Sequence, residues 1–138
     1  MNLSLIASNL PMLFCSLFVA ILFLQSGFDK LFDWKSNLDW LTEHFAKSIF
    51  AGSVSMMLAT LTLLEIATGF LAAAGLIYQI ATGSAYLVFV ASIVGATTLT
   101  ALFFGQRVAR DYPGAAVLVP YFLLMLTMMY LSNPFKPN

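Results

Sequence analysis

The 138-residue chain is 61% hydrophobic and only 9% charged, whereas a soluble domain carries about 25% charged residues because its surface faces water. Its six basic and six acidic side chains balance. This balance excludes the basic footprint of a nucleic-acid-binding protein and a polybasic arm that would hold the chain on a membrane surface. The single cysteine, Cys15, excludes an internal disulfide. These numbers predict one integral membrane domain over residues 1–138.

Four apolar segments are long enough to cross a membrane as helices, which takes about 20 residues each. Pro11 suits the first turn of the first segment. Asn133-Pro134 is expected to end the last one, and Gly83 to form a tight turn between the second and the third. The predicted spans are residues 11–30, 53–76, 85–104 and 113–131.

Residues 36–48, SNLDWLTEHFAKS, form the one markedly polar stretch. Leu38, Leu41 and Phe45 recur at steps of three and four residues, and Asp39 and Glu43 follow another face. This pattern indicates a short amphipathic helix at the membrane interface. The predicted fold is therefore all-α: a transmembrane four-helix bundle with a short interfacial helix between spans one and two.

An even number of spans places both termini on one side of the membrane. The loops after spans one and three hold five basic residues, whereas the terminal segments hold one, Lys136. The excess of basic residues in cytoplasmic loops predicts that these two loops are cytoplasmic and that the termini are outside.

Glu65 lies near the middle of the second span, where a charge costs on the order of 3 kcal/mol or more. We expect it to be protonated and hydrogen-bonded to the neutral side chains of Gln25, Thr97 or Thr100. Lys30 belongs to the same candidate buried polar site, but it starts about 15 Å shallower at 1.5 Å per residue, which predicts that it does not reach the carboxyl. Glu65 either accepts protons or a ligand, or it holds neighbouring helices together.

Arg107, Arg110 and Asp111 form a charge cluster in the loop after span three. The cluster is suited to binding an acidic headgroup or an anionic substrate, or to clamping the acidic residues of the first loop, and we favour the clamp. His44 is the only histidine and is expected to be exposed. Because a metal site needs three or four ligands, no metal centre is predicted.

Pairs of small residues four apart occur in spans two and three, Gly69 with Ala73 and Ala91 with Gly95. Such pairs allow helix backbones to approach closely. They predict tight packing, which we expect between spans two and three.

Three segments together resemble the DoxX-like family of small four-helix bacterial membrane proteins: LFLQSGFDKLFD, LLEIATGFLAAAGL and GQRVARDYPGAAVLVPYF. The first carries the family's pattern on Ser26, Gly27 and Lys30, and the second on Glu65 and Gly69. The resemblance implies a multi-pass protein of the bacterial inner membrane with a redox association, as in thiosulfate:quinone oxidoreductase or oxidative-stress complexes. Family members commonly keep their termini in the cytoplasm, which is opposite to the charge-based topology.

Two functions agree with these features of the sequence. The first is an accessory or anchoring subunit of a redox or respiratory-type membrane complex, without catalysis or a cofactor of its own, whose partners are other membrane subunits, copies of itself, and lipid. The alternative is an oxidoreductase subunit in which Glu65 and Gln25 bind a quinone, because a carboxyl and an amide suit a ring that accepts hydrogen bonds and protons. A carrier is disfavoured, since one intramembrane carboxyl leaves no relay.

Overall fold

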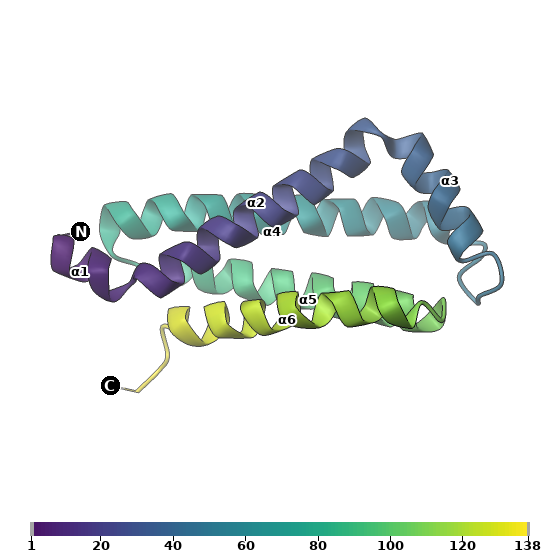
Figure 1. The fold of residues 1–138 in the computed structure, drawn as a ribbon. Helices are drawn as coiled ribbons and strands as arrows, with labels where there is room; N and C mark the ends of the chain where they lie inside the picture. The colour runs from purple at the N-terminus through teal and green to yellow at the C-terminus, as the bar shows by residue number, and fades with distance from the viewer. Residues whose placement is uncertain (1, 138) are drawn as a thin grey trace.

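The computed structural model describes residues 2–137, and this part of the chain is built from helices (Figure 1). Four of the helices are long and apolar enough to cross a membrane. The predicted all-α bundle with four spans is confirmed, and the chain is a multi-pass membrane protein. The helices are α1 (Leu3–Ser8), α2 (Leu10–Phe32), α3 (Trp34–His44), α4 (Val54–Thr82), α5 (Tyr86–Val108) and α6 (Tyr112–Ser132).

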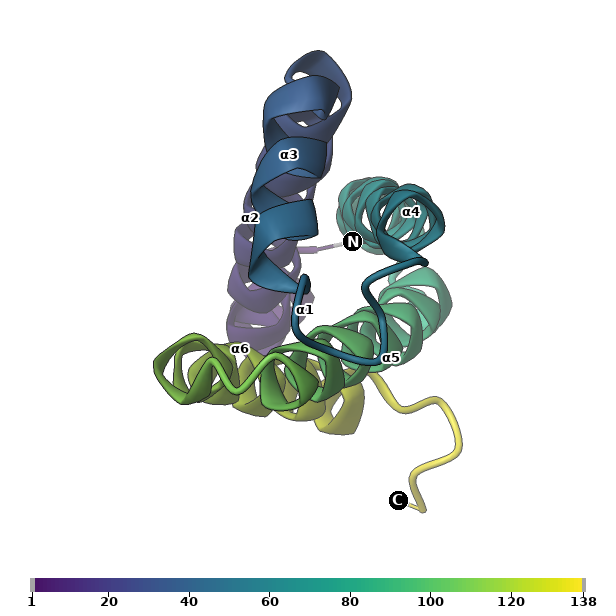
Figure 2. The same ribbon diagram turned by 90° about the vertical axis from the view of Figure 1, so that its right-hand side faces the viewer.

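The four long helices pack in chain order, α2 on α4, α4 on α5 and α5 on α6, while α2 and α6 touch much less. Both ends of the chain lie at one end of the bundle, as an even number of spans requires (Figure 1). Seen from the opposite end, α4, α5 and α6 form an arc, and α2 lies on its open side (Figure 2). The core between them includes Val19, Val88 and Met125, all fully buried.

The short helix α3 lies across the end of the bundle away from the termini (Figures 1 and 2). It corresponds to the amphipathic helix predicted within residues 36–48, although it begins at Trp34 and ends at His44. Its carboxyl end is followed by Phe45, whose side chain is buried. The segment therefore folds back from the end of α2 toward the start of α4.

Helix α4 is longer than the predicted second span. It continues through residues 77–82, which the sequence suggested were a loop, and it ends at Gly83 in the left-handed region, with φ of 82°. Its 29 residues span about 43 Å at 1.5 Å per residue. Gln79, in this last part of the helix, is fully buried, and its amide has no hydrogen-bond partner within residues 2–137.

Small residues set the helix crossings, but not only those that we expected. A Cβ atom on Gly69 would lie 2.8 Å from the backbone nitrogen of Leu24, so this glycine permits the contact of α4 with α2 rather than with α5. Gly75 is the residue that brings α4 against α5, since a Cβ there would lie 2.9 Å from the nitrogen of Val88. Gly95 faces both Met125 of α6 and Thr68 of α4, since a Cβ there would lie 3.0 Å from Thr68 Cγ2, so this glycine does lie at the predicted contact of spans two and three.

We expect the substitution Gly83→Ala to lower the free energy of unfolding by about 1–2 kcal/mol, because a side chain disfavours the left-handed conformation that ends α4. A Cβ at Gly83 would meet nothing within 4 Å, so backbone strain is the only cost. Unfolding by sodium dodecyl sulfate in mixed micelles, followed by circular dichroism, measures the loss. Gly52→Ala is the control, since Gly52 also has open space and no positive φ; equal stability of the two variants would contradict the prediction.

Candidate functional site

The candidate site centres on an ion pair between two transmembrane helices. Lys30 Nζ of α2 lies 3.0 Å from Glu65 Oε2 of α4. The Glu65 side chain is 4% exposed and that of Lys30 is 16% exposed. Both charges are therefore largely removed from solvent and lipid, and each is balanced by the other.

Ser26 completes this network from within α2, one helical turn before Lys30. Its hydroxyl accepts a hydrogen bond from Lys30 Nζ at 3.0 Å and donates one to Glu65 Oε1 at 3.1 Å. The ammonium group also lies 3.4 Å from the carbonyl oxygen of Ser26. Of the two carboxylate oxygens, Oε1 accepts the hydrogen bond from Ser26, whereas Oε2 faces the ammonium of Lys30 as an ion pair and accepts no hydrogen bond within the described residues.

The prediction that Lys30 does not reach Glu65 is wrong, and the helix crossing gives the reason. Gly27 packs against Ile66, where a Cβ would lie 3.2 Å from the backbone nitrogen, and Gly69 packs against Leu24. The last turns of α2, around Gly27 and Lys30, consequently lie beside the middle third of α4 and not beside its start. The predicted separation of about 15 Å assumed that the end of α2 lies level with the start of α4.

The neutral partners predicted for Glu65 are also wrong. Gln25, Thr97 and Thr100 all lie on the outer surface of the bundle. Thr97 and Thr100 donate to backbone carbonyls of their own helix instead. The structure therefore brings Lys30 and Ser26 to Glu65, and it does not bring Gln25 there.

Two other threonines occupy the interior between α4 and α5. Thr68 and Thr98 are fully buried, and their hydroxyl oxygens are 3.5 Å apart. Each hydroxyl also donates to a carbonyl one turn earlier in its own helix. Because each hydroxyl proton is used within its own helix, the two buried hydroxyls are satisfied locally and their oxygens only lie in contact between the helices.

A second polar cluster joins α3 to the last turn of α5 and to the start of α6. His44 Nε2 lies 2.8 Å from Gln106 Oε1 and 3.6 Å from Asp111 Oδ2. The imidazole also stacks on Trp40 with ring centroids 4.5 Å apart. The prediction of an exposed histidine is wrong, because the side chain of His44 is only 17% exposed. Its contacts with Gln106 and Asp111 hold α3 against the bundle. A lone histidine gives no sequence signal for this role.

The arginines of the loop cluster do not form the predicted clamp. Within residues 2–137 neither Arg107 nor Arg110 has an acidic side chain within ion-pair distance. The guanidinium of Arg107 instead lies 4.4 Å from the centre of the Tyr112 ring. Asp111 caps the start of α6 by accepting a hydrogen bond from the backbone of Gly114.

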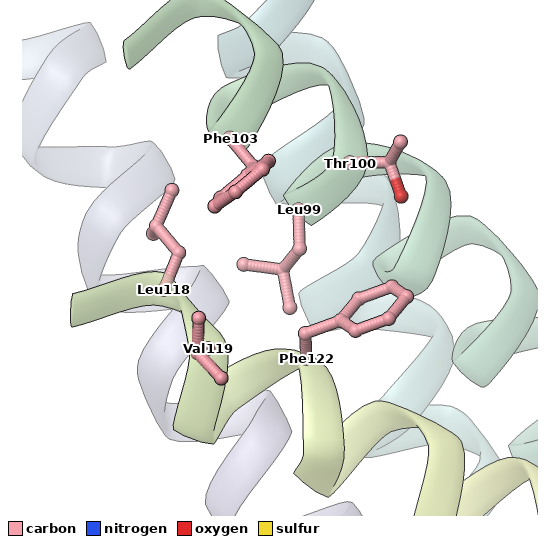
Figure 3. A pocket seen from close by; sticks show the side chains of 6 residues that line it. All are labelled: Leu99, Thr100, Phe103, Leu118, Val119 and Phe122. Atoms are coloured by element: carbon pink, nitrogen blue, oxygen red, sulfur yellow. The ribbon is translucent and has the colours of Figure 1, made fainter. Parts of the chain in front are cut away.

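Two cavities open on the apolar surface of the bundle. One, of about 320 Å³, lies between α5 and α6, and Figure 3 shows Leu99, Phe103 and Phe122 around it. The other, of about 350 Å³, lies between α3, α4 and α5, with Gln106 in its wall. None of the three residues of the ion-pair network, Ser26, Lys30 and Glu65, lines either cavity.

No family model, curated protein or solved structure matches the chain. Within residues 2–137 no three His, Cys, Asp or Glu side chains are grouped closely enough to hold a metal ion. A function is therefore inferred from the polar side chains that the structure brings together.

Proposed function

We propose that this chain is an accessory or anchoring subunit of a redox or respiratory-type complex in the bacterial inner membrane, without catalysis of its own. The observation that carries the proposal is the closed network of Glu65, Lys30 and Ser26. A buried carboxyl is usually a functional feature of a membrane protein. Here its oxygens face partners on α2, one through a hydrogen bond from Ser26 and the other through the ion pair with Lys30, which suits a role in holding two helices together.

The outer face of α6 supports assembly with another membrane protein. In the most apolar stretch of α6 only 17% of the residues are buried within the bundle, whereas the corresponding share in the other three spans is 33–39%. Val119, Leu123, Leu126 and Tyr130 are exposed on it and recur at the steps that place residues on one helix face. We propose that this stripe contacts a partner span.

The redox assignment is supported by the resemblance of the segments around Lys30 and Glu65 to the DoxX-like family. The quinone alternative receives less support from the geometry. It needs Glu65 and Gln25 at one ligand, but Gln25 lies on the outer surface while Glu65 is buried against Lys30.

We expect the tagged chain, produced at native level and solubilised in a mild detergent, to co-purify with redox subunits identified by mass spectrometry. The variants Leu123→Trp and Leu126→Trp on the α6 stripe should release these subunits. Leu63→Trp, at an equally apolar and 69% exposed position of α4, is the matched control and should retain them. A stable, quinone-free monomer that turns over a substrate would refute the proposal.

A further inference from the structure

The cavity between α3, α4 and α5 has an apolar body and one polar end. Side chains such as Leu41, Met57 and Leu64 surround its volume of about 350 Å³, which is within the range of small-molecule sites. Phe45 forms part of the wall where α3 meets the bundle, and Gln106 lines it near the end of α5. A ligand that fits must be apolar along its length and polar at one end.

Two basic residues lie at the end of the bundle where Gln106 lines this cavity, although neither is part of its wall. Arg107 is adjacent in sequence to Gln106, and both belong to the last turn of α5. Arg110 follows in the turn before α6 with a φ of 59° and an exposed side chain. The nearest acid in sequence, Asp111, is engaged by the backbone of Gly114 and faces His44. The guanidinium of Arg107 stacks on the Tyr112 ring, which leaves the N–H groups at its edge to meet an anion, and within the described residues Arg110 has no acidic partner.

Gln106 adds hydrogen-bond donors at the same place. Its oxygen is taken by His44, and its amide nitrogen donates to no group within residues 2–137. The imidazole–amide contact also holds α3 over the cavity. The polar end therefore presents one amide, and two cations lie at the same end of the bundle, a combination that matches an oxyanion rather than a cation.

We propose that this cavity binds one acyl chain of an anionic membrane phospholipid, whose phosphate lies against Arg107 and Arg110. The position favours a lipid over a soluble anion, because the cavity is walled by two membrane-spanning helices and by the amphipathic helix at the bundle end. Its charge favours an anionic headgroup over a zwitterionic one, as basic residues beside a bilayer attract anionic lipid. The inference is independent of the proposed role as a subunit.

Native mass spectrometry of the full chain tests the site, with phosphatidylglycerol and phosphatidylcholine of the same acyl chains as probes. We expect the wild-type protein to retain phosphatidylglycerol preferentially. Ala101→Phe and Thr60→Phe fill the cavity and should each remove that retention. Ala59→Phe is the matched control, since Ala59 is exposed on α4 outside the cavity and should leave retention unchanged.

The headgroup is tested separately. Arg107→Gln with Arg110→Gln should weaken phosphatidylglycerol binding about tenfold, since each basic residue near anionic lipid contributes several-fold, and should leave phosphatidylcholine binding unchanged. Lys35→Gln with Lys136→Gln removes the same charge from exposed positions and should have little effect. Equal retention of both lipids by the wild type, occupation by detergent alone, or full retention in a folded cavity-filling variant would overturn the proposal.

Discussion

Replacing Lys30 by methionine is expected to lower the free energy of unfolding by about 3–5 kcal/mol, because it leaves a buried carboxylate without its cation. Methionine is unbranched and only one atom shorter than lysine, so the substitution keeps most of the packing and removes both the contact with Glu65 at 3.0 Å and the hydrogen bond to Ser26 at 3.0 Å. Unfolding by sodium dodecyl sulfate in mixed micelles, followed by loss of helical circular dichroism, measures the change.

Two further variants distinguish the stability that the ion pair contributes from the stability that each side chain contributes alone. Glu65→Gln should also destabilise, but by less, since the longer Lys30 side chain lies near the end of α2 and can extend toward water. The double variant Lys30→Met with Glu65→Leu should recover much of the loss, because apolar residues replace buried ion pairs at little cost. Lys35→Met, at an exposed position, is the control. Additive losses in the double variant would show that the two side chains do not interact.

The second large effect is expected at the helix crossings. Gly69→Ala and Gly75→Ala should each cost about 1–3 kcal/mol or more, because overpacking forces the backbone to move. At both positions the new Cβ would meet backbone atoms of the facing helix, those of Leu24 and Val88, at less than 3.0 Å. The same detergent titration measures the losses.

Gly95→Ala provides a graded comparison, since the atom that a Cβ would meet first belongs to the flexible side chain of Met125. Its effect should be smaller than that of either backbone contact. Gly52→Ala should have almost none, as nothing lies within 4 Å. If all four variants unfolded alike, close backbone approach would not explain these glycines.

The spans could be predicted because a span is defined by the hydropathy and the length of one contiguous segment, without reference to the rest of the chain. All four were placed within a few residues at most ends, and the amphipathic pattern around Leu38 and Leu41 was enough to predict α3. The predicted end of the second span at residue 76 is too early, because the helix continues through residues 77–82 up to the turn at Gly83. The short helix α1 was missed, since residues before Pro11 show no clear periodicity.

The partner of Glu65 could not be predicted from depth alone, because depth depends on how two helices cross. A usable signal was nevertheless present. Gly27 precedes Lys30 by three residues, and Gly69 follows Glu65 by four. If antiparallel helices cross at these glycines, both charged residues lie about one turn to the same side of the crossing, which is where the structure places them.

The order of packing along the chain has a consequence for biogenesis. Each long helix makes its main contacts with the one that precedes it, and only α2 and α6 meet across the full length of the sequence, where the contact is slight. A span that leaves the ribosome therefore finds its packing partner already in the membrane. Local contacts of this kind favour rapid assembly, so the bundle can form stepwise during insertion without waiting for its last helix.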